Sequence, residues 1–359
     1  MSENGPTGYD ASAWVCDGGN QQGSSITLAL ADDVTCTITN TKRGHIIVDK
    51  VTIGGDATFG FDASGGTAPA YQDFAISGAD TPNDQELRPG SYSVVENIIP
   101  INWDQTSATC DNGDDPSAIT LGAGDVVTCT FVNTKRGIII VDKVTQPAGH
   151  SQVFSFDASG GSYIDFNLTD AQNPNSQVLV PGAYSVSETI PANWDLLSAT
   201  CVSSIQDSET PGSLELDAGE TITCTFTNQK DSYIIVDKVT DPSGDTQSFT
   251  FNTTGAGYTG FSLTDVDEPN NSGDLAPGVY SVAEVVPAGW DLTSVYCGGA
   301  IDGPVPSAWY TTYTPGDPLQ LDAGETITCT FNNQKDANII VQKVTIGGDD
   351  SFEFDTDYA

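Results

Sequence analysis

The stretch Ile46-Ile-Val-Asp-Lys-Val-Thr52 occurs four times in this chain of 359 residues. It returns unchanged at 139–145 and 234–240, and with glutamine in place of aspartate at 339–345. The lysines of successive copies lie 93, 95 and 105 residues apart. Apolar and polar residues alternate along each copy, which is the pattern of a half-buried strand. A repeat of this length indicates a tandem array of one β domain.

The first three copies are followed by the same series of motifs. A Phe-x-Phe pair comes first, then a polar loop, then Pro-Gly-x-Tyr-Ser-Val, and each repeat ends in Thr-Cys-Thr-Phe-x-Asn-x-Lys. The Pro-Gly pair suits a tight turn, because proline fixes φ and glycine accepts a positive φ. The segments between turns are short and rich in β-branched and aromatic residues, and none sustains a helical period. We therefore predict an all-β chain, a tandem array of Ig-like β-sandwich domains with very short linkers.

The repeat boundaries divide the chain into five parts. These are the C-terminal part of a repeat at 1–43, full repeats at 44–136, 137–230 and 231–335, and the N-terminal part of a further repeat at 336–359. The third full repeat carries an insertion near 298–318. Joins with almost no linker favour a stiff array over a flexible one.

The composition excludes several classes of function. Asp and Glu number 49 against 11 Lys and Arg, and the resulting net charge of −38 repels nucleic acid and anionic membrane surfaces. No stretch approaches the roughly 20 apolar residues of a membrane span, and no signal segment follows Met1, so any export signal or anchor is expected outside this chain or already removed. Eight cysteines without a Cys-x-x-Cys or histidine cluster favour an extracellular, oxidising compartment over a metal site.

The cysteines come two to a repeat. Eight cysteines allow 105 pairings, but the repeat favours pairing within each copy. The expected disulfides are Cys16–Cys36, Cys110–Cys129, Cys201–Cys224 and Cys297–Cys329. Each would close a short loop, which the chain-entropy model values at about 3 kcal/mol.

Strand alternation directs three polar residues of every repeat inward. Lys50 shares a face with Ile46 and Val48, since side chains two positions apart lie on the same side of a strand. By the same count, the glutamate of Tyr-Ser-Val-x-Glu and the asparagine of Cys-Thr-Phe-x-Asn lie on the apolar faces of their strands. Each full repeat therefore aims one Lys, one Glu and one Asn into its core.

Burying these groups suggests a reaction between them. Burial lowers the pKa of a lysine and raises that of a glutamate, so the pair can become a neutral, nucleophilic amine beside a carboxylic acid. An asparagine carboxamide against that amine can then lose ammonia to form a Lys–Asn isopeptide bond, with the glutamate moving protons. The alternative is a buried ion pair or hydrogen-bonded cluster that never reacts.

These motifs resemble the Cna-B type of prealbumin-like domain found in bacterial and archaeal surface proteins, pilins and adhesins. The likeness rests on the lysine of the first strand, the E-box that begins Tyr92-Ser-Val-Val-Glu96, and the asparagine of the last strand. The chain departs from the family in its disulfide and in ending the E-box with Trp where Tyr is usual. Carried over, the resemblance implies three triads: Lys50, Glu96 and Asn133; Lys143, Glu188 and Asn228; Lys238, Glu284 and Asn333.

The two incomplete repeats carry parts of further triads. Glu3 and Asn40 lie in the N-terminal part, and Lys343 lies in the C-terminal part. Either the chain is an excerpt of a longer array, or the ends of successive subunits complement each other, with Lys343 meeting Asn40. In both cases the expected partners are further copies of the same repeat, in the same chain or in the next subunit.

No cofactor is expected. Asp170, Asp265 and Asp267 lie in polar loops that could ligate calcium, but their spacing does not match an EF-hand, so plain turn chemistry is favoured. No constellation for an external substrate is present, so the chain is not expected to be an enzyme beyond its own crosslinking.

The leading functional hypothesis is a load-bearing subunit or segment of an extracellular filament or stalk. The alternative is an adhesin that binds a ligand through exposed loops. Only the insertion, with Trp309, Tyr310 and Tyr313, offers a candidate aromatic patch for such binding, and it could equally pack on its own domain.

Overall fold

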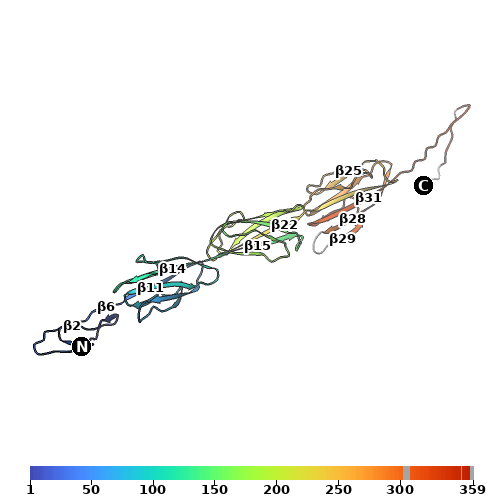
Figure 1. The fold of residues 1–359 in the computed structure, drawn as a ribbon. Helices are drawn as coiled ribbons and strands as arrows, with labels where there is room; N and C mark the ends of the chain where they lie inside the picture. Colours follow the sequence, from blue (N-terminus) through green and yellow to red (C-terminus); the bar gives the residue numbers. More distant parts are fainter. Residues whose placement is uncertain (302–307, 349, 356–359) are drawn as a thin grey trace. The chain divides into compact units, whose positions relative to one another are not determined.

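The computed structural model describes residues 1–301, 308–348 and 350–355, with the side chains of 301 and 308–310 excepted. Within these residues the chain is built from strands and turns and contains no helix, so the predicted all-β class is confirmed (Figure 1). No described segment forms a helix that could cross a membrane. The chain divides into two compact units, one of residues 1–144, 152–191 and 196–227 and one of 145–151, 192–195 and 228–359.

The first full repeat consists of two four-stranded sheets. In the first sheet the order is β10 (Asn83–Leu87), β7 (Gly44–Ile53), β14 (Val126–Lys135) and β12 (Trp103–Cys110). In the second sheet the order is β13 (Ile119–Leu121), β11 (Gly90–Ile98), β8 (Thr58–Gly65) and β9 (Phe74–Ser77). The first and last strands, β7 and β14, are parallel neighbours, and the other pairs are antiparallel.

The second full repeat has the same strand order. One sheet contains β18 (Asn175–Leu179), β15 (Gly137–Gln146), β22 (Thr221–Lys230) and β20 (Trp194–Ser203). The other contains β17 (Phe166–Leu168), β16 (Phe154–Ser159), β19 (Gly182–Thr189) and β21 (Leu214–Leu216).

The third full repeat adds one strand to this plan. Its larger sheet contains β26 (Asn270–Asn271), β23 (Tyr233–Asp241), β31 (Glu325–Lys335), β28 (Trp290–Ile301) and β29 (Ala308–Thr312). Its smaller sheet contains β25 (Phe261–Leu263), β24 (Phe249–Thr254), β27 (Gly278–Val285) and β30 (Leu319–Leu321). The extra strand β29 comes from the insertion.

The core of the first repeat follows from the alternation of its strands. Inward residues of β7 and β14, such as Ile46, Val48 and Phe131, are fully or almost fully buried. They pack with the Phe-x-Phe pair of β8, whose Phe61 ring lies edge-on to Phe131 at 5.1 Å between centroids. The third repeat repeats this contact at 5.1 Å between Phe251 and Phe331, so one aromatic arrangement fills both cores.

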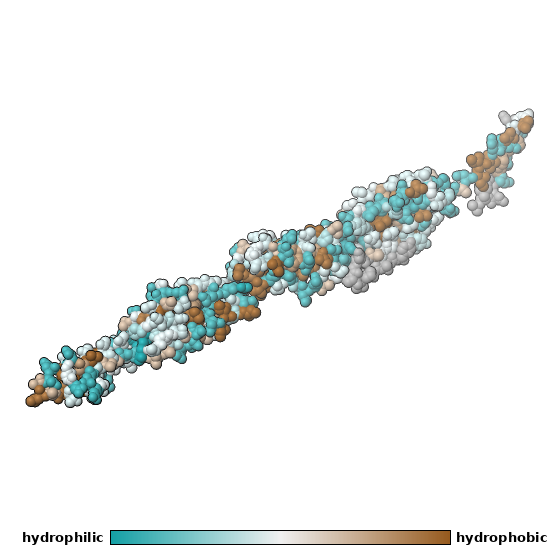
Figure 2. All heavy atoms as spheres, viewed as in Figure 1, coloured by the Kyte–Doolittle hydropathy of each residue, from teal (hydrophilic) through white to brown (hydrophobic). Residues whose placement is uncertain are grey.

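The N-terminal part forms three short two-stranded ladders. They are β1 (Tyr9–Ala11) with β6 (Asn40–Lys42), β2 (Val15–Asp17) with β5 (Thr35–Thr37), and β3 (Asn20–Gln22) with β4 (Ser25–Thr27). Residues 336–348 and 350–355 form no strand. Their apolar side chains lie at the surface, with Ile340 91% and Ile346 98% exposed, and this segment shows brown patches in Figure 2.

Candidate functional site

The three predicted polar residues of the first repeat meet in its core. The parallel pairing of β7 with β14 sets Lys50 opposite Phe131, and Asn133 follows two residues later on the same face. Lys50 Nζ donates a hydrogen bond to Asn133 Oδ1 at 2.8 Å, and Asn133 Nδ2 donates to Glu96 Oε2 at 2.8 Å. Glu96 Oε1 lies 3.7 Å from Lys50 Nζ, and neither of these two side chains is exposed to solvent.

The third repeat contains the same cluster. Lys238 Nζ donates to Asn333 Oδ1 at 2.8 Å, and Asn333 Nδ2 donates to Glu284 Oε1 at 3.0 Å. The same glutamate oxygen lies 3.9 Å from Lys238 Nζ. The arrangement therefore recurs with nearly the same distances in two copies of the repeat.

In the second repeat the lysine and glutamate also lie close together. Lys143 Nζ is 3.5 Å from Glu188 Oε1, and it donates to the main-chain oxygen of Phe226 at 3.2 Å. Asn228 is fully buried on the same strand, two residues beyond Phe226.

A phenylalanine ring lies against each lysine, which sequence reasoning missed. Lys50 Nζ is 4.2 Å from the centre of the Phe59 ring, and Lys238 Nζ is 4.3 Å from that of Phe249. The ring is the first member of the Phe-x-Phe motif, so the motif itself was the available signal. Such a ring excludes water and attracts a cation through its face.

Burial shifts the pKa values of the clusters toward neutral groups. Removal from water lowers the pKa of the Lys50 ammonium below its usual range, although Glu96 opposes the shift. Burial likewise raises the pKa of the Glu96 carboxyl, against the opposing effect of the Asn133 hydrogen bond. The pKa of Lys238 is lowered and that of Glu284 is raised for the same reason. Both shifts favour proton transfer from lysine to glutamate.

The two oxygens of Glu96 lie beside different groups. Oε1 has no hydrogen bond within the described chain and faces Lys50, so it can accept the proton of the amine. Oε2 contacts the amide nitrogen of Asn133, which is the group that would leave as ammonia. A carboxyl group placed between nucleophile and leaving group can move protons for both.

Four disulfides lie at the positions that the repeat indicated. They join Cys16 to Cys36, Cys110 to Cys129, Cys201 to Cys224 and Cys297 to Cys329. In the first and third repeats each bridge links the last strand to its antiparallel neighbour, at directly opposed positions.

The residues of the incomplete repeats lie at the surface. Asn40 Nδ2 donates to Glu3 Oε1 at 2.6 Å, which is the same Asn–Glu contact as in the first and third repeats, but the pair is exposed. Lys343 is exposed and its Nζ lies 3.7 Å from the Phe352 ring centre.

The calcium candidates show turn contacts. Asp265 Oδ2 accepts a hydrogen bond from Thr240 Oγ1 at 2.9 Å, and Asp267 Oδ2 accepts one from the main-chain nitrogen of Thr264 at 2.7 Å. Asp170 lies in a different repeat from both. Within the described residues, three carboxylates approach one another only at Asp207, Asp217 and Glu220, which the sequence did not single out.

One aromatic side chain of the insertion is described, and it packs against its own repeat. Tyr313 is only 7% exposed and belongs to the core cluster of the third repeat. Trp309 and Tyr310 lie on β29, and their side chains are outside the described residues. Tyr313 is therefore not part of an exposed aromatic patch.

Comparison with protein families identifies the repeats. The model of a prealbumin-like fold domain matches residues 46–135, 139–230 and 234–335, and a second model with the same description matches residues 1–38. The resemblance drawn from the E-box motifs is therefore confirmed. No curated protein matches the chain.

Several solved structures are similar at low identity. The TIE protein of Bacillus anthracis is 18% identical over 85% of this chain and 54% of its own, with a TM-score of 0.33. The pilus adhesin SpaC of Lactobacillus rhamnosus GG in its open conformation is 13% identical over 86% of this chain and 46% of its own, with a TM-score of 0.26. BcpA, the major pilin subunit of Bacillus cereus, is 11% identical over 82% of this chain and 100% of its own, with a TM-score of 0.30.

The chain spans about half the length of the first two of these structures. The last two are a pilus adhesin and a major pilin subunit.

Proposed function

Because this chain belongs to the family of prealbumin-like fold domains, we propose that it is a load-bearing segment of an extracellular cell-surface filament or stalk. Lys–Asn isopeptide bonds and disulfides stabilise its three full repeats, which act as domains bounded at 44–136, 137–230 and 231–335. The observation that carries the proposal is the sealed contact between lysine, asparagine and glutamate, seen completely in the first and third repeats.

The reaction balances without a cofactor or an external reagent. Glu96 takes a proton from Lys50, and the neutral amine attacks Cγ of Asn133. The bond from Nζ to Cγ forms and the bond from Cγ to Nδ2 breaks. Glu96 gives its proton to Nδ2 as that bond breaks and takes the second proton of the former amine, so ammonia departs and Glu96 ends as a carboxylic acid.

The position of the bond suits a protein under tension. Lys50 lies on the first strand of its repeat and Asn133 on the last, and these strands are direct neighbours. A covalent tie at this place would let a pulling force pass from the preceding repeat to the next without opening the sandwich. The chain's high negative charge would keep such a protein soluble at a cell surface.

Intact mass tests the proposal directly. Three isopeptide bonds are expected to remove about 51 Da, one ammonia each, and four disulfides a further amount of about 8 Da. In Lys50→Ala the mass deficit should be smaller by one ammonia, once the mass change of the substituted side chain is subtracted. Lys135→Ala, which alters a lysine outside the clusters, should leave the deficit unchanged. A deficit equal to that of the disulfides alone would refute the crosslinks.

The same chemistry extends to the incomplete repeats as part of the proposal. Asn40 and Glu3 already contact each other, and Lys343 lies on a segment with the sequence of a first strand. A further copy of the repeat, in the same polypeptide or in a neighbouring subunit, would supply the missing members.

Denaturing electrophoresis of the native assembly separates these two sources. Completion by a neighbouring subunit predicts a ladder at multiples of this chain, which Lys343→Ala reduces to monomer. Completion within one polypeptide predicts a single large species of fixed size. A stable native monomer of 359 residues, unlinked at both ends, would contradict both.

A further inference from the structure

Four corresponding positions meet where one repeat joins the next. In the first join, between the N-terminal part and the first full repeat, they hold Asp10, Arg43, Glu86 and Arg88. Arg43 donates from Nε and Nη2 to the two oxygens of Asp10 at 2.9 Å each, and Arg88 Nη2 donates to the same carboxylate at 3.1 Å. Glu86 Oε2 lies 3.7 Å from Arg43 Nη1. Two cations therefore balance two anions at this join.

The second join, between the first and second full repeats, is also neutral. Arg136 donates from Nε and Nη2 to the two oxygens of Asp104 at 2.8 Å each, and the other two positions hold Val178 and Val180. The main chain is tied here as well, by a hydrogen bond from Arg136 N to Asn102 O at 2.8 Å. A guanidinium group thus lies beside the same aspartate position in both joins.

The third join, between the second and third full repeats, carries three carboxylates and no guanidinium group. Its four positions hold Asp195, Asp231, Asp274 and Ala276, all within the second compact unit. Asp231 N donates to Asn193 O at 3.1 Å, the same main-chain bond that the arginine makes in the second join. Leu275 N donates to Ser232 O at 2.9 Å, which holds Asp274 at the start of the same strand. An aspartate has therefore taken the place of the arginine.

Asp231 is buried without a counter-charge. The residue is only 8% exposed, and its carboxylate makes no hydrogen bond or ion pair among the described residues. Burial raises the pKa of the Asp231 carboxyl, and the charges of Asp274 and Asp195 raise it further, with Lys230 opposing them. A buried carboxylate without a partner is costly. The third join therefore lacks a cation that the first two joins contain.

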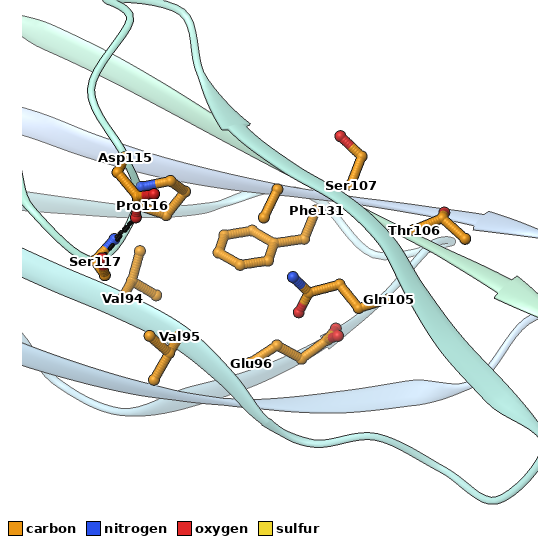
Figure 3. A pocket seen from close by; sticks show the side chains of 11 residues that line it. Val94, Val95, Glu96, Gln105, Thr106, Ser107, Asp115, Pro116, Ser117 and Phe131 are labelled. Atoms are coloured by element: carbon orange, nitrogen blue, oxygen red, sulfur yellow. Dashed lines mark hydrogen bonds between the residues drawn. The ribbon is translucent and has the colours of Figure 1, made fainter.

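The carboxylates around a cavity of the first repeat show the contrast. This cavity of about 430 Å³ is lined by Asp115 and Glu96, and Figure 3 shows Asp115 beside Ser117. Ser117 donates to Asp115 from its hydroxyl at 2.6 Å and its main-chain nitrogen at 2.8 Å, and these bonds lower the pKa of the Asp115 carboxyl. Glu96 belongs to the cluster with Lys50. Both carboxylates of this lining thus have partners, whereas Asp231 has none among the described residues.

We propose that the third join binds a calcium ion beside Asp231, Asp195 and Asp274, in the place that a guanidinium group occupies in the first two joins. Calcium takes six to eight oxygen ligands from carboxylates, amide carbonyls and water, in flexible geometry. Asn193 Oδ1, which accepts from the Tyr233 hydroxyl at 3.4 Å, is a further oxygen at this join. The three carboxylates do not all lie within 4.8 Å of one another, so water would complete the shell.

Calorimetric titration of calcium chloride into the full chain, stripped of metal with EDTA and held at pH 7, tests the site. One saturable site is expected, with a Kd between about 0.1 and 1 mM, the range of extracellular calcium modules. Amide exchange at residues 231–233 and 272–275 should slow as the site fills. Sodium chloride at matched ionic strength should not reproduce this protection, because it only screens the charges.

Matched variants locate the ion. Asp231→Asn removes the buried charge but keeps the main-chain bond, and should weaken calcium binding about tenfold or more. Asp231→Arg should abolish binding, because the guanidinium group would pair with Asp195 as in the second join. Asp336→Asn changes the corresponding but exposed residue after the third repeat, and Asp207→Asn changes the other acidic cluster. Both of these controls should leave the affinity unchanged.

Three results would overturn the calcium site. They are no saturable binding below about 10 mM calcium, equal protection by sodium chloride, and an affinity of Asp231→Asn equal to that of the unaltered chain. Loss of the saturable site in Asp207→Asn would place the ion at the other acidic cluster and would overturn the proposal as well. None of these measurements depends on the Lys–Asn crosslinks, so their outcome is separate from the test of the proposed function.

Discussion

Glu96→Ala is expected to leave the first repeat folded but with Lys50 and Asn133 unlinked. The glutamate is not bonded in the product, and its task is to carry protons between the amine and the departing ammonia. Loss of a positioned acid–base group slows such a step by roughly 100-fold to 10,000-fold. Water cannot take over this proton transfer, because Lys50 and Asn133 are buried.

Proteolytic mapping after reduction of the disulfides measures this outcome. Peptides containing Lys50 and Asn133 should appear separately in the variant and as one branched species in the unaltered chain. Glu86→Ala changes an exposed glutamate of the same repeat and should leave the branched species in place. The crosslinks of the second and third repeats serve as internal controls. An intact link between Lys50 and Asn133 in Glu96→Ala would remove this residue from the mechanism.

Lys50→Ala is expected to make the first repeat extensible under force. With the bond present, the 83 positions that separate Lys50 and Asn133 are bypassed by the load. Without it, and with Cys110–Cys129 reduced, unfolding of this segment should lengthen the chain by about 300 Å, at about 3.6 Å per residue. Single-molecule pulling of the reduced chain should therefore show one new unfolding step.

The same variant should also lower the free energy of unfolding of the first repeat. The chain-entropy model gives about 4.5 kcal/mol for a tie that closes a loop of this size, and about 3.2 kcal/mol for the disulfide. Cys129→Ser is the matched control, since it removes the shorter tie from the same strand. An equal pulling trace for Lys50→Ala and the unaltered chain would show that the cluster bears no covalent bond.

Strand alternation was enough to predict which polar residues point inward. Lys50 lies two residues from Val48, and Asn133 lies two from Phe131, so the face of each side chain follows from its own strand. The repeat likewise indicated cysteine pairing within each copy. These features depend on local geometry or on internal symmetry, both of which can be read from the chain.

Other features depend on which strands become neighbours. The contact between Lys50 and Asn133 requires parallel pairing of β7 with β14 in one register, and the orientation of the Asn133 amide requires Glu96 from the opposite sheet. The place of Phe59 beside the amine arises in the same way.

The sequence by itself determined the all-β class, the repeat and the inward faces of the lysine, glutamate and asparagine, because period-two patterning acts within a strand. Only the tertiary structure decided that the inserted strand β29 pairs with β28 and that Tyr313 packs into the core of the third repeat. The physical reason is that the location of an inserted segment depends on edge hydrogen bonds and on packing between distant residues, and no local pattern records these contacts.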